Sequence, residues 1–242
     1  MRGLRFVQCL VTSLITLLLS GCLETSLVYN PNMHQTGRTA GRGKVRVHLN
    51  GGLAQQIYTS VEDRKVVSRV SEQGLNGSPG LAIALSGHVD LGGSVEIGSA
   101  ASGNCIGGRF YLKDMLTDSQ SAWAFSVMPA IAFLDGPTGN NESTGSTLSS
   151  SLVAFELHAP VSYHVGRYFA VFAEPQLMAV SVAAPFKAGA REDIHFPNQT
   201  MHKTWLGAGV GLGIKEGPFV PEISLFYMND IWRTLGGISF TF

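Results

Sequence analysis

Acidic and basic residues alternate with apolar ones at positions that hairpin geometry brings together. If the chain turns near residue 102, Glu96 faces Arg109. If it turns near residue 165, Glu156 faces Glu174 with His158 diagonal to it. Directly opposed residues on antiparallel strands come within about 5 Å of each other. The first pair therefore predicts a salt bridge, and the second places two carboxylates side by side.

Two carboxylates about 5 Å apart are the geometry of a retaining glycosidase. The same pair can belong to an interior ion-pair network, in which a cation such as Arg46, His158 or Arg233 lies between the carboxylates. A narrow lumen filled by side chains leaves little room for a substrate. We therefore expect an interior network, with a narrow solute or ion path as the alternative. The residues expected to line this lumen are Arg46, His48, Asn50, Glu96, Arg109, Tyr111, Glu156, His158, Glu174, Gln176, Glu222 and Arg233.

Other patterns that carry catalytic or metal chemistry are weak in this sequence. Ser149, Ser150 and Ser151 precede His158, but His158 lies several residues further along the expected strand, on its inward face. No Gly-x-Ser-x-Gly elbow occurs, and no His-x-x-x-His or Cys cluster has metal-ligand spacing. We therefore expect no catalytic residues, no metal and no cofactor. A lipid-modifying hydrolase stays open as an alternative, because many barrel enzymes carry no short motif.

The elements that must position these residues are strands. From Lys44 onward the apolar residues recur at every second position, which is typical of half-buried strands. The pattern predicts an all-β, up-and-down antiparallel transmembrane β-barrel of about ten strands, eight being the alternative. The expected strands cover residues 44–56, 79–88, 92–100, 104–113, 121–134, 149–162, 167–182, 203–214, 218–228 and 231–242.

The last strands show the alternation most clearly. Glycines occupy every second position between Leu206 and Ile214, which leaves room on the lumen face for bulky groups from across the barrel. Long connections are expected at residues 57–78, 135–148 and 183–202, all at one end of the barrel. Aromatic residues near the strand ends predict interfacial girdles: Trp123, Phe133, Tyr168, Phe169, Trp205, Tyr227 and Trp232.

The composition agrees with a membrane barrel and excludes other classes. Of the 242 residues only 14% are charged, with 17 Lys and Arg balancing 17 Asp and Glu, and 29 are Gly. Soluble domains are nearer 25% charged. A nucleic-acid binder would need an excess of basic residues. A lipid-anchored, lipocalin-like binding protein is the remaining alternative, and it would turn the apolar face inward.

The first residues read as an export signal. Arg2 and Arg5 precede an uncharged apolar run over residues 6–19, which is too short for a spanning helix. The run ends in Leu19-Ser20-Gly21-Cys22, which resembles the lipobox of bacterial lipoproteins. That resemblance implies removal of residues 1–21 and acylation of Cys22 with chains such as palmitate. Leu23, which follows, implies sorting to the outer membrane.

The rest of the chain resembles poorly characterised outer-membrane barrel lipoproteins. The resemblance rests on residues 34–43, just after the lipobox, and on the terminal strand ending in Phe240 and Phe242, which matches the signal read by barrel-assembly machinery. It implies a lipidated tether at residues 22–43 and a barrel at residues 44–242. The implied protein is non-enzymatic, structural or surface-exposed, and lipid-anchored on the periplasmic side. Its implied partners are outer-membrane lipid and the assembly and sorting machinery, with no nucleic acid; the sequence identifies no ligand.

Overall fold

The computed structural model describes residues 23–31, 33, 36–62, 65–100, 102–141, 145–166, 168–189, 199–214 and 218–242. In these ranges no helix is long and apolar enough to cross a membrane. Their regular structure is all strand, in the order β1 (Glu24–Tyr29), β2 (Val45–Glu62), β3 (Lys65–Ala84), β4 (Val89–Ala100), β5 (Gly103–Met115), β6 (Trp123–Asp135), β7 (Gly139–Asn141), β8 (Ser146–Leu148), β9 (Ser151–His158), β10 (Val161–Val165), β11 (Phe169–Ala184), β12 (Phe186–Lys187), β13 (Gln199–Ile214), β14 (Phe219–Met228) and β15 (Ile231–Thr241).

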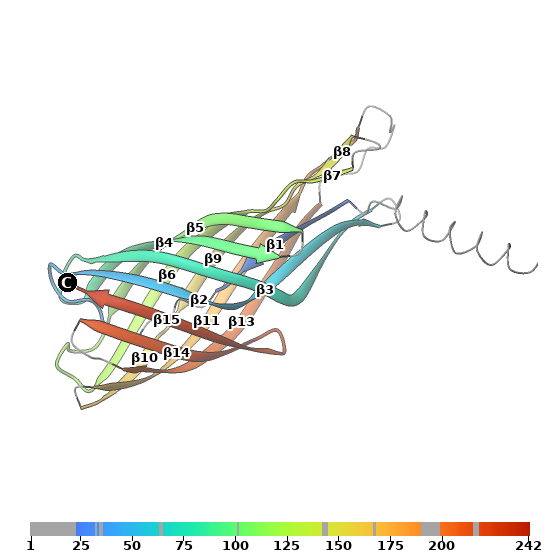
Figure 1. Cartoon of the computed structure of the whole chain (residues 1–242). Helices are drawn as coiled ribbons and strands as arrows, with labels where there is room; N and C mark the ends of the chain where they lie inside the picture. The colour runs from blue at the N-terminus through green and yellow to red at the C-terminus, as the bar shows by residue number, and fades with distance from the viewer. Residues whose placement is uncertain are drawn as a thin grey trace, which may run out of the picture.

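Ten antiparallel strands form a closed barrel, which confirms the predicted fold class (Figure 1). β9 and β10 together make one of the ten, because both pair with β6 and with β11. They are separated at Ala159 and Pro160, where proline supplies no ladder donor. The ring closes where β2 pairs with β15, from Arg46 with Thr241 to Gly52 with Leu235.

Residues 45 and 242 meet at one end of the barrel, which we call the C-terminal mouth; the β2–β3 turn lies at the other end, the far mouth. The expected connection at residues 57–78 is wrong. β2 and β3 continue through it as one ladder that reaches the pair Glu62 and Lys65, further than is needed to cross a membrane. The other two expected connections, at residues 135–148 and 183–202, hold short strands β7, β8 and β12, which form a small sheet.

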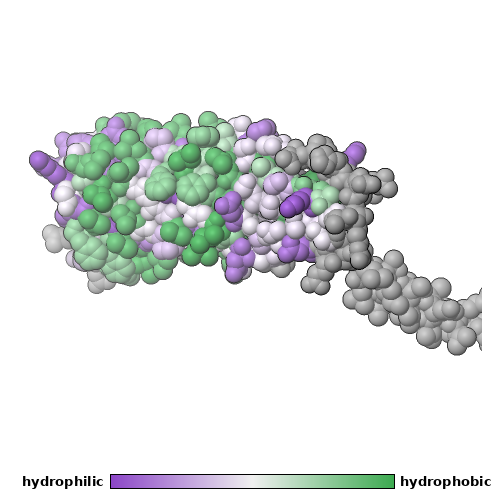
Figure 2. All heavy atoms as spheres, turned by 90° about the horizontal axis from the view of Figure 1, so that it is seen from above, coloured by the Kyte–Doolittle hydropathy of each residue, from purple (hydrophilic) through white to green (hydrophobic). Residues whose placement is uncertain are grey.

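The outer wall is apolar, as the alternation predicts for a lipid-facing barrel. On β15, Trp232 is 64% exposed while Arg233 on the opposite face is 3% exposed. The apolar surface gathers toward the C-terminal mouth and gives way to more hydrophilic residues toward the far mouth (Figure 2). Six of the seven aromatics predicted for the girdles face outward, but Trp205 is buried inside, because it shares the inward parity of its strand.

The stretch suggested by the sequence as a tether runs inside the barrel. We call residues 23–31, 33 and 36–40 of this stretch the amino-terminal strap. β1 pairs with the part of β2 near the far mouth, from Glu24 with Ser60 to Tyr29 with Gln55. The strap then passes along the lumen, and Gly41 accepts a hydrogen bond from Lys44 at the C-terminal mouth, where β2 begins (Figure 1). The strap therefore spans the lumen from one mouth to the other.

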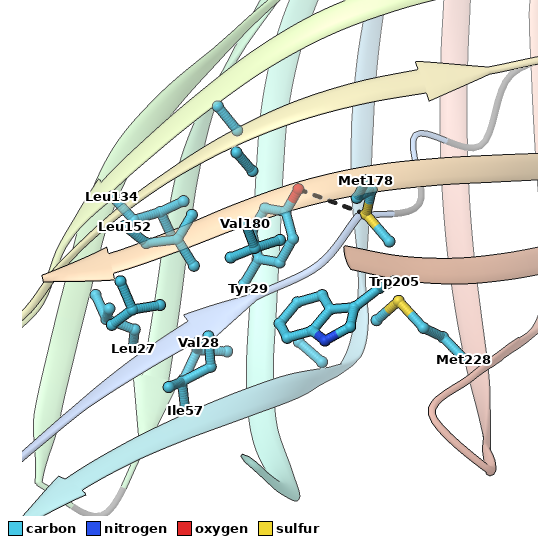
Figure 3. Packing of buried hydrophobic residues seen from close by; sticks show 14 of the residues in the cluster. Leu27, Val28, Tyr29, Ile57, Leu134, Leu152, Met178, Val180, Trp205 and Met228 are labelled. Carbon is cyan, nitrogen blue, oxygen red and sulfur yellow. Dashed lines mark hydrogen bonds between the residues drawn. The ribbon is translucent and has the colours of Figure 1, made fainter. Parts of the chain in front are cut away.

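The half of the interior around β1 is apolar. Leu27, Val28 and Tyr29 are at most 1% exposed and pack against wall residues of many strands (Figure 3). The Tyr29 and Trp205 rings lie 6.4 Å apart, centroid to centroid. A polar lumen was expected, and this half is apolar because the strap packs against the wall and excludes water there. The wall residues of this cluster include Ile57, Leu134, Leu152, Met178, Val180, Met228 and Leu235.

The inward glycines of β13 make room for aromatic rings, but the rings come from adjoining strands rather than from across the lumen. A Cβ at Gly207 would lie 2.6 Å from the Phe226 ring, and one at Gly211 would lie 2.6 Å from the carbonyl oxygen of Ile223 and closer still to the Phe172 ring. Gly211 is paired directly with Phe172. Glycine here lets a large ring cover the neighbouring backbone.

This close packing gives a matched pair of substitutions. Gly211→Ala forces the Phe172 ring and the Ile223 backbone apart, and we expect it to lower the free energy of unfolding by about 1–3 kcal/mol. Gly236→Ala adds the same methyl group where no atom lies within 4 Å, and should change it little. Urea unfolding of both variants in detergent checks this; equal losses would mean that the ring packing is not what requires glycine.

Candidate functional site: the interior network and the strap

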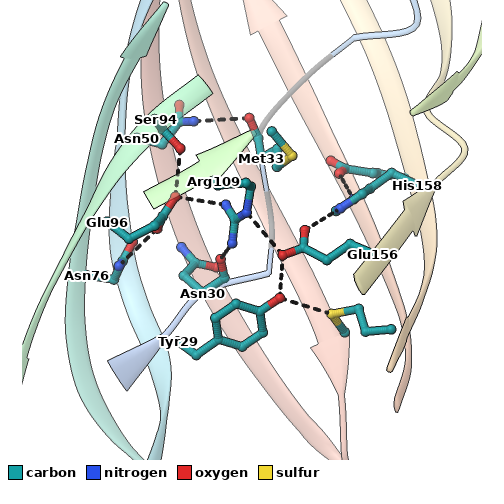
Figure 4. A network of polar contacts seen from close by, with 12 residues as sticks. Tyr29, Asn30, Met33, Asn50, Asn76, Ser94, Glu96, Arg109, Glu156 and His158 are labelled. Atoms are coloured by element: carbon teal, nitrogen blue, oxygen red, sulfur yellow. Dashed lines mark hydrogen bonds and ion pairs between the residues drawn. The ribbon is translucent and has the colours of Figure 1, made fainter. Parts of the chain in front are cut away.

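Arg109 lies at the centre of the interior and is 1% exposed. Its guanidinium contacts two carboxylates from different strands: Nη1 lies 3.0 Å from Glu96 Oε1, and Nε lies 3.1 Å from Glu156 Oε1 (Figure 4). Its Nη2 donates to the backbone oxygen of Asn30 at 2.5 Å. The same side chain therefore joins two parts of the wall, β4 and β9, to the strap.

The two carboxylates are held by further donors. Ser94 donates to Glu96 Oε1 at 2.7 Å, and Asn76 donates to Glu96 Oε2 at 3.3 Å. The Tyr29 hydroxyl donates to Glu156 Oε1 at 2.5 Å, and the Arg109 guanidinium carbon lies 5.7 Å from the centroid of the Tyr29 ring. β1 thus contributes both apolar packing and a donor to the network.

His158 lies between two carboxylates. Its Nε2 is 2.7 Å from Glu156 Oε2, and its Nδ1 is 2.8 Å from Glu174 Oε1. Both ring nitrogens face acceptors, an arrangement that a doubly protonated imidazolium satisfies. All three side chains are almost fully buried. His158 is one of the cations that the sequence proposed for this position.

The strap is hydrogen-bonded to the wall along its course. Asn50 donates to the Met33 carbonyl at 3.0 Å, and Gly37 N–H donates to Ser162 Oγ at 3.1 Å. Lys113 donates to the carbonyl oxygens of Thr36 and Arg38 at 2.5 and 2.7 Å. A Cβ at residue 37 would overlap the carbonyl oxygen of Ala124, so glycine is required for the strap to lie this close to β6.

The sequence-predicted lumen residues all lie on the inward face of the wall. The contacts above join five of them: Glu96, Arg109, Glu156, His158 and Glu174. The Gln176 side-chain amide has no hydrogen-bond partner among the described residues. Arg46 is half-buried. The other predicted lumen residues are buried: His48, Asn50, Tyr111, Glu222 and Arg233.

The hairpin registers differ from the expected ones. Arg109 is paired with Ser94 and reaches Glu96 diagonally, because the β4–β5 turn is centred nearer to Ala101 than expected. Glu156 is paired with Met178, so it does not face Glu174 directly. The reason is the turn after β10, which follows Val165 and shifts the whole β11 ladder. His158 is nevertheless diagonal to Glu174, as expected, since it pairs with Gln176.

A cavity of about 320 Å³ lies where the strap leaves the lumen at the C-terminal mouth. Basic side chains on its wall are Arg38, Lys44 and Arg46, and Glu222 is the carboxylate among the residues that line it. Arg46 donates to the carbonyl oxygen of Arg38 at 3.4 Å. The cavity is thus built jointly by the strap and the barrel wall.

Neither enzyme arrangement considered from the sequence is assembled. Ser150 is buried and lies 3.0 Å from the Thr25 hydroxyl of the strap, while both nitrogens of His158 are occupied by carboxylates. The two carboxylates considered for a glycosidase, Glu156 and Glu174, have His158 between them, in contact with both. The lipocalin-like alternative is also wrong, because large apolar side chains cover the outside of the barrel.

No family model matches the sequence, and no curated protein matches it. Among solved structures, the outer membrane protease OmpT of Escherichia coli is similar with a TM-score of 0.44 and 7% identity, over 90% of this chain and 96% of that one. The N-terminal β-barrel domain of Pseudomonas aeruginosa OprF has a TM-score of 0.39 and 12% identity, over 84% and 99%. Ail of Yersinia pestis has a TM-score of 0.36 and 9% identity, over 83% and 99%. None of the activities in these names is assigned to this chain.

Several residues that hold the interior together were not singled out from the sequence. Tyr29, Asn30 and Met33 belong to the strap, and Lys113 and Asp90 belong to the wall that binds it. One signal for them was present: the strand segments at residues 128–134, 152–155 and 177–180 are apolar on both faces. Strands that are apolar on both faces are typical of sheets covered on both sides, which here means a lumen filled by protein.

Proposed function

We propose that this protein is a lipid-anchored β-barrel of the bacterial outer membrane whose lumen is closed by its own amino-terminal strap. Its role in this proposal is structural, as a surface-exposed scaffold, rather than transport or catalysis. The observation that carries it is the position of β1 in the lumen, with Leu27, Val28 and Tyr29 buried against the wall.

The physical argument concerns what an open lumen would expose. An eight-stranded barrel is just filled by its own side chains, and a ten-stranded one is wider. Here the extra room holds an extended chain segment. The inward residues Leu152, Met178 and Val180 contact that segment, whereas a water-filled channel would be lined by polar groups. This supports a closed barrel.

Planar bilayer recordings test the closed state directly. The intact protein, inserted into a bilayer and shown to be folded by its heat-modifiable migration on a gel, should give no stable conductance steps. Arg109 binds the strap at the Asn30 carbonyl oxygen and is itself held by Glu96 and Glu156 of the wall, so the strap is expected to stay in the lumen during the recording. Regular steps from the folded intact protein would contradict the proposal.

The proposal of a lipid anchor rests on the lipobox sequence alone, because Cys22 lies outside the described residues. The proposal predicts that the protein incorporates radiolabelled palmitate in cells and that Cys22→Ser abolishes the label. Cys9→Ser is the matched control, because Cys9 lies in the segment expected to be removed. Retention of the label in the Cys22→Ser protein would refute lipidation at this residue.

The proposed partners follow from the two ends of the chain. Phe240 and Phe242 are exposed on the outer face at the C-terminal mouth, in a position from which barrel-assembly machinery could bind them. Lipoprotein-sorting machinery would act on the acylated amino end, and outer-membrane lipid would surround the apolar wall.

A further inference from the structure

The strap places the beginning of the described chain at the mouth opposite to the carboxyl terminus. The Val61 N–H donates to the carbonyl oxygen of Leu23 at 3.3 Å, and Glu24 is paired with Ser60, both beside the β2–β3 turn. At the other mouth, Val45 and Phe242 exchange backbone hydrogen bonds of 3.2 and 2.9 Å. The residues that precede the barrel therefore start at one mouth and reach the other through the lumen.

The far mouth has the features of the cell-surface side. Outer-membrane barrels carry short turns on the periplasmic side and longer excursions outside. Here the β3–β4 turn at the C-terminal mouth spans only residues 85–88, whereas the far mouth carries the small sheet of β7, β8 and β12 between β6 and β9 and after β11.

The wall itself gives a second, independent indication. β2 has 18 residues and β3 has 20, although about 10 are enough to cross a membrane. The apolar surface lies toward the C-terminal mouth (Figure 2). The surplus of β2, residues 55–60, is the part that pairs with β1. β1 therefore lies at the level of the wall that extends past the lipid.

We infer that the amino end of the mature chain passes through its own barrel and reaches the cell surface. Cys22 is joined to Leu23 by one peptide bond, so a lipid on Cys22 would be held on the cell-surface side, not in the periplasmic leaflet expected from the sequence. This inference rests on the proposed function for the membrane and the orientation of the barrel. The direction of the strap comes from the hydrogen bonds above.

Thiol labelling on living cells tests it. Single cysteines are introduced in the full chain as Glu24→Cys at the start of β1, Lys187→Cys in the small sheet of the far mouth, and Lys44→Cys at the C-terminal mouth; Lys44 and Lys187 are exposed and Glu24 is half-buried. A membrane-impermeant maleimide is applied before and after the outer membrane is permeabilised. The unaltered protein, whose Cys105 is buried, gives the background.

The expected result is labelling of Glu24→Cys and Lys187→Cys on intact cells, with Lys44→Cys labelled only after permeabilisation. If Lys187→Cys reacts on intact cells but Glu24→Cys reacts only after permeabilisation, the threaded strap is overturned while the barrel stands. If neither reacts until permeabilisation, the proposed orientation itself fails. Should Glu24→Cys stay unreactive throughout, an epitope tag inserted between Cys22 and Leu23 decides: antibody binding to intact cells supports the inference, and binding only to permeabilised cells overturns it.

Discussion

Replacing Arg109 with methionine is expected to lower the free energy of unfolding by about 3–5 kcal/mol, because it leaves buried carboxylates without their cation. Glu96 would lose its compensating cation, and Glu156 would keep only His158. Both carboxylates would keep their other hydrogen-bond donors. The strap would also lose its contact at Asn30. The measurement is urea unfolding of the folded barrel in detergent, followed by tryptophan fluorescence and by heat-modifiable migration.

Two comparisons isolate the buried charge. Arg46→Met removes the same charge from a half-buried position near the C-terminal mouth, and its effect should be nearer 0–1 kcal/mol because water screens the charge there. Adding Glu96→Gln and Glu156→Gln to Arg109→Met should recover part of the lost stability, since the uncompensated charges are then gone. Equal losses for Arg109→Met and Arg46→Met would show that the central network does not stabilise the barrel.

Deleting residues 24–36 is expected to turn a silent barrel into a conducting one. The deletion removes β1 and most of the strap that fills the lumen, and leaves every barrel strand intact. In planar bilayers the recordings should change from the leak of the membrane to resolved single-channel steps. Heat-modifiable migration identifies the preparations that are folded, so that a failure to fold is not mistaken for a closed lumen.

A second variant keeps the strap but weakens its packing. Leu27→Ser combined with Tyr29→Phe removes an apolar side chain that is fully buried and the hydroxyl that donates to Glu156. Brief openings should appear, at a frequency between those of the intact and deleted proteins. Removal of residues 140–146, at the tip of the β7–β8 hairpin, is the control and should leave the barrel silent. A folded deletion protein that stays silent would mean that the wall side chains alone close the lumen.

The barrel could be predicted from the sequence because its signal is local and repeated. Alternation along β15, for example Trp232 outside and Arg233 inside, needs no knowledge of other strands, and the count of ten strands is confirmed. The exact positions of the turns were harder to predict from the sequence. A turn centred one residue away shifts each pair by two, and this is why Glu96 meets Arg109 diagonally. The turn after β10 is centred two residues away, which shifts each pair by four, so Glu156 is paired with Met178 and not with Glu174.

The strap could not be predicted by the same reasoning. Residues 30–43 are polar and rich in glycine and asparagine, which is as typical of an exposed linker as of a segment whose backbone is bound by lumen side chains. What distinguishes the two is the partner: Lys113, Asn50 and Ser162 bind strap backbone groups from strands far along the chain. Such contacts leave no pattern in the strap itself. The apolar inward positions of β9 and β11 were the available signal, and it lay elsewhere in the sequence.

The ladder between β2 and β15 constrains the order in which the barrel and the strap can assemble. Gly52 pairs with Leu235, so the ladder that closes the ring joins residues that are nearly the whole barrel apart in the chain. Pairings of such large sequence separation form slowly. Because the strap leads directly into β2, it must already lie on the lumen side when that ladder forms. A finished ring would have to admit the whole strap lengthwise, so closure of the barrel and threading of its amino end belong to the same step of folding.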